Sequence, residues 1–265
     1  MAPNNYYTSM IERLQAKIYA FMDDIRRGTN IFEGRRSIEE QLSEEYHARF
    51  LIELIQNADD ACGKDGQILI VIRQEPSPRV IVFNTGKGFT QKNFESLCTL
   101  GLTDKNPEEA IGNKGLGFRS VLEVCKSPII YSSDFDRSAD TQPNFDGYCF
   151  CFDPDELVNA LRTTSESFVS GDGVPQMVIS GEPFQLFENA QPEIVESLKN
   201  SLNDHEILER SCKWLPVYEM PIPIKVSDPL LLWAAKLGFA TAVSIEIKPG
   251  TETVFRKALK GDVLK

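Results

Sequence analysis

The chain has 265 residues, of which 42% are hydrophobic and 25% charged, and its formal net charge is −11. This composition excludes a disordered polypeptide and suffices for one large α/β domain or two small ones. The acidic balance argues against a protein that wraps nucleic acid unaided, so direct nucleic-acid binding is not expected of this fragment. No stretch approaches the roughly 20 apolar residues of a membrane helix, and no charged leader with an apolar core begins the chain. We therefore expect a cytoplasmic protein without membrane contact.

The six cysteines occur singly rather than in CxxC pairs, and both histidines lie far from them in the sequence. We expect reduced thiols. Cys149 and Cys151 would share one face of a strand, which leaves a metal site as the minor alternative to buried small side chains.

Two helices are predicted at the start of the chain. Apolar residues recur at helical spacing over residues 9–27, and Gly28 ends the run. We assign residues 1–36 to an N-terminal helical extension. A capping-box pattern over residues 37–40 then opens a helix whose apolar stripe ends near Gly63.

The next segments alternate between strands and short helices. Residues 67–73 and 79–84 are rich in β-branched side chains and predict two paired strands. A short helix is expected over 91–99, a polar lid over 100–110, and a helix from Gly117 through Val124.

The second half of the chain is harder to interpret, and residues 153–212 form a poorly readable insertion. We expect helices near 154–162 and 192–210 within it, and a short helix over 229–236 after it. Strands are predicted over residues 127–133, 147–152, 217–226 and 239–248.

The strongest functional signal is a helical face that carries Glu53, Asn57 and Asp60. Positions i, i+4 and i+7 point in one direction, although such a face taken alone is more often solvated surface. A carboxylate can accept a proton from water, and a neutral amide oxygen can ligate Mg²⁺ without adding charge beside a triphosphate. Two glycine-punctuated segments follow, at residues 84–89 and 111–118, and the three motifs together predict a nucleotide site.

The second glycine segment, residues 111–118, places three glycines just before a predicted helix. Backbone N–H groups and the positive end of that helix could therefore face a phosphate chain. The segment is not a Rossmann signature, because no suitable strand leads directly into a G-x-G-x-x-G run. The sequence contains no Walker A motif either.

This order and spacing resembles the GHKL, or Bergerat-fold, ATPases, and within them the sacsin-type, heat-shock-90-like N-terminal ATPase domains. The resemblance covers residues 53–118, with a weaker match at 238–241. It implies an α/β (α+β) two-layer sandwich, with a mixed, largely antiparallel sheet and helices on one face. We therefore treat residues 1–265 as a single ATP-binding domain that forms the N-terminal part of a larger protein.

The resemblance also implies roles for individual residues. Glu53 matches the carboxylate that polarises the attacking water, Asn57 matches the Mg²⁺ ligand, and Asp60 orients the helix or binds a water near the base. Asn84 stands where the family usually has an aspartate that accepts from the adenine amino group. An amide oxygen can still accept that bond, but the amide NH₂ must then find another partner. The other implied cofactor-binding residues are Gly86, Gly88, Lys105, Gly112, Lys114, Gly115, Leu116, Gly117, Phe118 and Thr241.

Two of these assignments compete with ordinary alternatives. Lys105, beside Thr103 in the lid, would reach the terminal phosphate on closure, and its alternative is a solvated lysine. Thr241 would face the adenine, and its alternative is a commonplace strand threonine. His47 lacks the sequence context of a kinase phosphoacceptor, so phosphotransfer is not expected.

The implied function is Mg²⁺-dependent ATP binding and slow hydrolysis that drives a lid or dimer switch. Relatives suggest a chaperone-like or regulatory multidomain protein, or a bacterial defence protein. The expected partners are ATP and ADP, a second copy of the chain in the ATP state, and downstream domains or a client. Two alternatives stay open: a nucleotide-binding module that does not hydrolyse, and the ATPase module of a DNA-processing machine.

Overall fold

A computed structural model describes most of the chain, with gaps. The described residues are 5–37, 49–74, 77–99, 118, 120–121, 124–135, 144–170, 177–179, 182–184, 192–251, 253 and 255–256.

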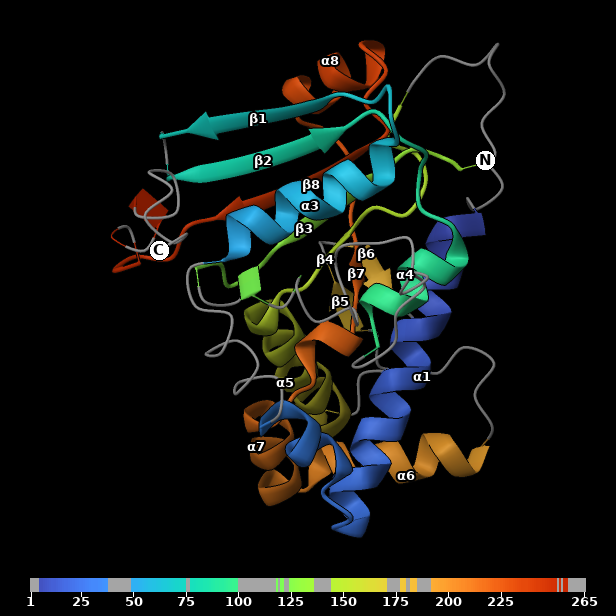
Figure 1. The fold of residues 1–265 in the computed structure, drawn as a ribbon. Coiled ribbons are helices and arrows are strands. Elements are labelled where there is room, and N and C mark those ends of the chain that lie inside the picture. Colours follow the sequence, from blue (N-terminus) through green and yellow to red (C-terminus); the bar gives the residue numbers. More distant parts are fainter. Residues whose placement is uncertain are drawn as a thin grey trace.

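The centre of the molecule is a six-stranded sheet in the order β1-β2-β8-β3-β4-β7 (Figure 1). Each of its described strand pairings is antiparallel. Its strands are β1 (Ile68–Arg73), β2 (Arg79–Asn84), β3 (Ile129–Ser132), β4 (Phe150–Cys151), β7 (Ile222–Pro223) and β8 (Thr241–Glu246). A separate hairpin pairs β5 (Met177–Ile179) with β6 (Glu182–Phe184).

Helices flank this sheet and extend below it in Figure 1. The helices are α1 (Asn5–Arg27), α3 (Phe50–Cys62), α4 (Gln91–Leu97), α5 (Pro154–Ser170), α6 (Pro192–Asn203), α7 (His205–Lys213), the 3₁₀ helix η2 (Val217–Glu219) and α8 (Pro229–Lys236). Residues 31–37 are also helical. The predicted α/β sandwich is confirmed. None of the helices in the described part of the chain is long and apolar enough to cross a membrane.

Alternating side chains of the strands enter two apolar clusters. Val80 and Val82 of β2 lie in the cluster that contains the buried face of α3, whereas Ile81 and Phe83 lie in the cluster that contains α8. This follows from the two-residue period of a strand. The helices therefore cover both faces of this half of the sheet, and α8 adds to the single helical face that the sequence predicted.

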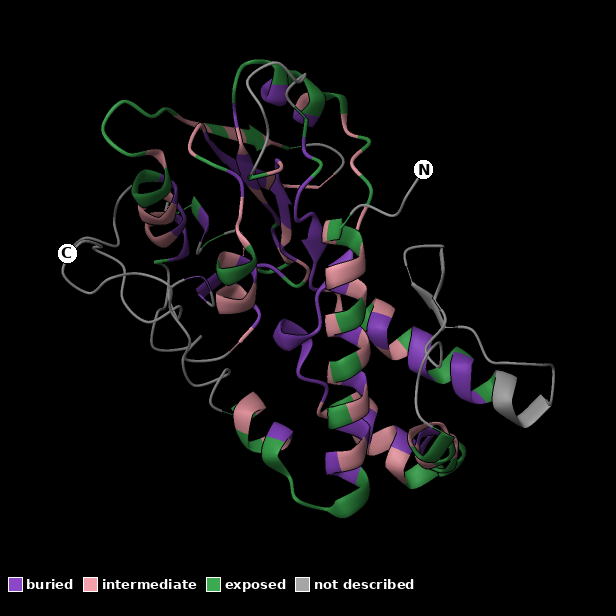
Figure 2. Cartoon of the chain, turned by 90° about the vertical axis from the view of Figure 1, so that its right-hand side faces the viewer, coloured by how far each residue is buried: buried purple, intermediate pink, exposed green. Residues whose placement is uncertain are grey.

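The N-terminal helix packs inside the same molecule. Its apolar residues, from Met10 to Ile25, are buried in the cluster shared with α3, and buried, intermediate and exposed positions alternate along it in Figure 2. The Arg13 guanidinium donates to the carbonyl oxygen of Cys98 at 2.7 Å and to Thr99 Oγ1 at 2.8 Å. Thus α1 holds the end of α4, directly before the segment predicted to be a lid.

Three predicted elements differ from the structure. The strand predicted over 217–226 is wrong for most of its length. The chain forms η2 and the two-residue strand β7 there, because Pro216, Pro221 and Pro223 have no N–H group to donate to a neighbouring strand.

The helix predicted over 192–210 is two helices. Asp204 separates them and caps α7 through bonds from the N–H groups of Glu206 and Ile207.

The helix predicted from Gly117 through Val124 is also corrected. Of its described residues, 118 and 120–121 have 3₁₀ geometry and Val124 lies in a turn, where the N–H of Cys125 donates to the carbonyl oxygen of Val121 at 2.8 Å. This turn leads at once into β3. The β5–β6 hairpin was not predicted, because its three-residue strands are too short to give a periodic signal.

Candidate functional site

Helix α3 presents the predicted polar face as expected. Its sheet-facing residues Phe50, Leu51, Leu54 and Ala58 are buried. Glu53 and Asn57 are half-buried and Asp60 is exposed, so all three lie off the apolar stripe. α3 packs along β2 on one face of the sheet (Figure 1). The helix therefore places a carboxylate and an amide at the border between the sheet and solvent.

Asn84 and Thr241 meet at one end of the sheet beneath this helix. Asn84 is the last residue of β2, Thr241 is the first of β8, and the two are direct partners in the antiparallel register. By strand alternation, both lie on the same face as Val82, the face that α3 covers. The Thr241 hydroxyl donates a hydrogen bond to Asn84 Oδ1, and the two side chains are only 5% and 4% exposed. The structure thus brings together two predicted base contacts from distant parts of the chain.

Gly86 and Gly88 permit close backbone packing beside Asn84. A β-carbon at Gly86 would lie 2.1 Å from the carbonyl oxygen of Ala61, and one at Gly88 would lie 2.0 Å from that of Ser133. No larger residue fits without movement of the backbone. The two glycines therefore bring the segment after β2 against both the end of α3 and the end of β3.

Substitution of Gly86 by alanine should destabilise the fold by about 1–3 kcal/mol, because the new methyl group collides with backbone rather than with a movable side chain. Gly34→Ala is the matched control, since nothing lies within 4 Å of a β-carbon there. Urea denaturation of both variants measures the difference. Equal midpoints would show that the loop after β2 adapts without cost.

Ser132 also contributes to the site, although it belongs to none of the sequence motifs and was not predicted. Its Oγ accepts from the N–H of Phe89 at 2.7 Å and donates to the carbonyl oxygen of Ser133 at 2.8 Å. This buried hydroxyl fixes the end of the glycine segment to β3. The only signal in the sequence is a small polar residue at the end of an apolar strand, which is too common to single out.

A cavity of about 310 Å³ adjoins these strand ends, lined in part by Gly86, Gly88, Ser133 and Gly238. Gly238 has φ +91° and donates its N–H to the carbonyl oxygen of Ala235, so it ends α8 and turns the chain toward Thr241. The glycine of the motif at 238–241 thus has a structural role in directing β8.

The remaining predicted site residues are placed as follows. Phe118 is buried in the apolar cluster shared with α3, where it packs as a core side chain. The other predicted phosphate and lid contacts lie outside the described residues; they are Thr103, Lys105, Gly112, Lys114, Gly115, Leu116 and Gly117.

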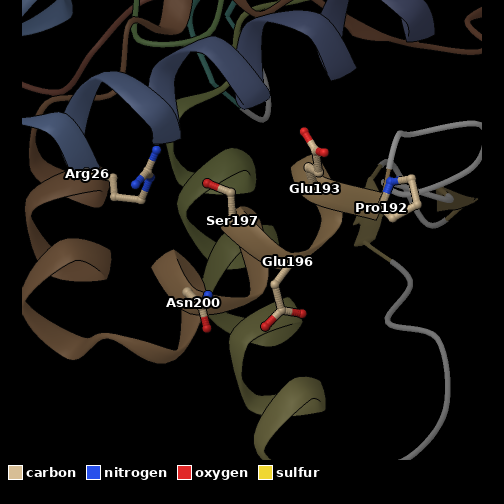
Figure 3. A pocket seen from close by; sticks show the side chains of 6 residues that line it. All are labelled: Arg26, Pro192, Glu193, Glu196, Ser197 and Asn200. Carbon is tan, nitrogen blue, oxygen red and sulfur yellow. The ribbon is translucent and has the colours of Figure 1, made fainter.

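A larger cavity, of about 680 Å³, lies between α1 and α6, away from every predicted motif (Figure 3). Glu193 and Glu196 line it, while Arg26, on the opposite wall, donates to the Asp23 carboxylate at 2.7 Å. Two carboxylates repel a triphosphate. The charge of this cavity therefore does not suit a nucleotide.

The side chains on the α3 face suit a Mg²⁺ ion that is shared with a bound nucleotide, rather than a metal ion whose ligands all come from the protein. Among the described residues, no group of three or more His, Cys, Asp or Glu side chains could enclose a metal ion. Mg²⁺ commonly takes one or two protein oxygens and completes its octahedron with phosphate oxygens and water. The Asn57 side-chain oxygen fits that demand.

Comparison with known proteins gives matches over the segment that carries the motifs. Residues 46–146 match the model of the histidine kinase-, DNA gyrase B- and HSP90-like ATPase family. Protein NO VEIN of Arabidopsis thaliana is 35% identical over 113 residues, which are 40% of this chain and 4% of that protein. Sacsin of Homo sapiens is 32% identical over 98 residues, which are 31% of this chain and 2% of that protein. The chain thus spans a small fraction of these relatives, and the predicted resemblance is confirmed for the matched segment.

Proposed function

We propose that the chain binds ATP with Mg²⁺ and hydrolyses it slowly, because residues 46–146 match the family of GHKL-type ATPases. One observation carries the proposal. The Glu53–Asn57 face of α3 and the Asn84–Thr241 pair lie over the same face of the sheet, although they come from three distant parts of the sequence.

Each residue of this arrangement has a distinct role in the proposal. Asn57 would supply one oxygen to Mg²⁺, and the ion would neutralise charge on the phosphates. Glu53 would orient and deprotonate the attacking water, which requires a carboxylate. Asn84 and Thr241 would contact the base. Lys105 and the glycines from Gly112 to Gly117 would bind the phosphates.

The biological role that we infer is a conformational switch. Nucleotide binding would close the lid at residues 100–110 and alter contacts with a second copy of the chain, a downstream domain or a client. We place this switch in a chaperone-like or regulatory multidomain protein of the cytoplasm, as part of the same proposal. A role in bacterial defence is the other function that we propose for such a switch.

Asn57→Ala should weaken binding of Mg²⁺–ATP by at least about tenfold, because an ion-ligand contact of roughly 1.5–3 kcal/mol is lost. Calorimetric titration of ATP and ADP, with and without Mg²⁺, measures the effect. Asn203→Ala, an exposed residue at the end of α6, is the matched control. Absence of binding by the native chain up to millimolar nucleotide would contradict the proposal.

A phosphate-release assay on the same samples separates hydrolysis from binding alone. Retained Mg²⁺–ATP binding without release would identify a module that binds and does not hydrolyse. Turnover stimulated by DNA in a salt-sensitive manner would instead indicate a DNA-processing machine.

A further inference from the structure

The side-chain nitrogen of Asn84 is a buried hydrogen-bond donor without an acceptor. Nδ2 has no hydrogen-bond partner among the described atoms, and the residue is 95% buried. An unpaired buried amide of this kind costs roughly 1–3 kcal/mol. Native structures seldom leave such a group unsatisfied unless a water or a ligand completes it.

The position of this donor points to a ligand. Asn84 lies at the end of β2, on the face of the sheet covered by α3, and a β-carbon at Gly86 would lie 3.2 Å from Nδ2. The amide therefore lies against the glycine segment, whose Gly86 also lines the cavity of about 310 Å³ at these strand ends. In the proposed function, this is the end of the pocket that holds the base.

Thr241 determines which end of the amide is available. Its hydroxyl donates to Oδ1, so the oxygen of Asn84 is engaged within the sheet and the NH₂ group remains. An aspartate at position 84 would behave differently, because an ionised carboxylate has only acceptors to offer. The pair of Asn84 with Thr241 therefore changes the polarity of the group that meets the base.

Purine bases differ in polarity at position 6. Adenine carries an amino donor there, whereas hypoxanthine and guanine carry a carbonyl acceptor. The NH₂ group of Asn84 can donate directly to that carbonyl. An adenine amino group would instead have to share Oδ1 with the Thr241 hydroxyl through the second lone pair of that oxygen, and the NH₂ group would stay unpaired.

We propose that Asn84, held by Thr241, reads an acceptor on the base, so that the site binds 6-oxopurine nucleoside triphosphates at least as tightly as ATP. This inference rests on the proposed nucleotide-binding function. It assigns base selectivity to one residue pair and widens the substrate class from ATP to purine triphosphates with a carbonyl at position 6.

The test compares ITP with ATP, since the hypoxanthine of ITP carries the position 6 carbonyl without the additional 2-amino group of guanine. Calorimetric titrations with Mg²⁺ on the native chain should give a dissociation constant for ITP equal to or below that for ATP. Asn84→Asp is nearly isosteric and should shift the ratio of the two constants by at least about tenfold in favour of ATP. A thermal melt checks that the variant is folded.

Thr241→Val provides a second variant that does not introduce charge. It removes the hydroxyl that engages Oδ1, so either end of the amide can face the base, and any native preference for ITP should fall toward equality. A native preference for ATP over ITP, or a ratio that Asn84→Asp leaves unchanged, would overturn the inference while the proposed function stands. Binding of neither nucleotide would overturn both.

Discussion

Replacement of Glu53 by glutamine should lower the rate of ATP hydrolysis by at least about 100-fold, because general-base catalysis typically contributes 10²–10⁴-fold. Glutamine retains the shape and polarity of the side chain but cannot take a proton from water. Glu53 lies off the buried stripe of α3, so the fold does not depend on its charge. The affinity for Mg²⁺–ATP should stay within about threefold, since an interaction made only in the transition state is removed.

Single-turnover hydrolysis with enzyme in excess is the suitable assay for a slow ATPase. Asp59→Asn is the matched control, because Asp59 is an exposed carboxylate on the same helix. Both variants lose one negative charge from α3. Equal rates for Glu53→Gln and the native chain would remove Glu53 from the chemistry, even if the site binds ATP.

Replacement of Glu219 by alanine should destabilise the protein by about 2–3 kcal/mol, because it removes the hydrogen bonds that two partly exposed cations donate to a buried carboxylate. Glu219 is fully buried in η2 and accepts from Lys17 of α1 and from Arg35 Nη1 at 3.1 Å. The alanine leaves both cations without their carboxylate and opens a cavity. The carboxylate therefore joins η2 to α1 and to the helical segment at residues 31–37.

Glu209→Ala is the control for this prediction. Glu209 forms an ion pair with Arg162 on the surface. When Glu209 is removed, water can solvate the Arg162 guanidinium. Chemical denaturation should show a lower midpoint for Glu219→Ala and little change for Glu209→Ala. Equal stability of the two variants would show that the buried carboxylate of Glu219 contributes no more than a surface ion pair.

Local patterns in the sequence predicted those elements whose ends carry chemical signals. The strand at Arg79–Asn84 and the helix at Pro229–Lys236 match the structure in their bounds. The strand is a β-branched run between a proline turn and a glycine. The helix starts with an Asp228 cap and a proline in its first turn, and ends before Gly238. Where such signals are dense, propensity and tertiary structure agree.

Elements that depend on distant contacts were harder to predict. The stretch 217–226 is apolar enough for a strand, yet its prolines and the buried Glu219 produce η2, and the partners of Glu219 lie in α1 and at Arg35. The sequence likewise suggested Asn84 and Thr241 as separate base contacts. Only the pairing of β2 with β8 shows that the threonine engages the oxygen of the amide.

The central claim is that α3, the end of β2 and the start of β8 form one nucleotide site. A crystal structure with Mg²⁺ and a non-hydrolysable ATP analogue tests it most directly. We expect the base beside Asn84 and Thr241, and the metal ion bound by the Asn57 side-chain oxygen. An analogue bound elsewhere, for example between α1 and α6, with these side chains unchanged, would contradict the claim.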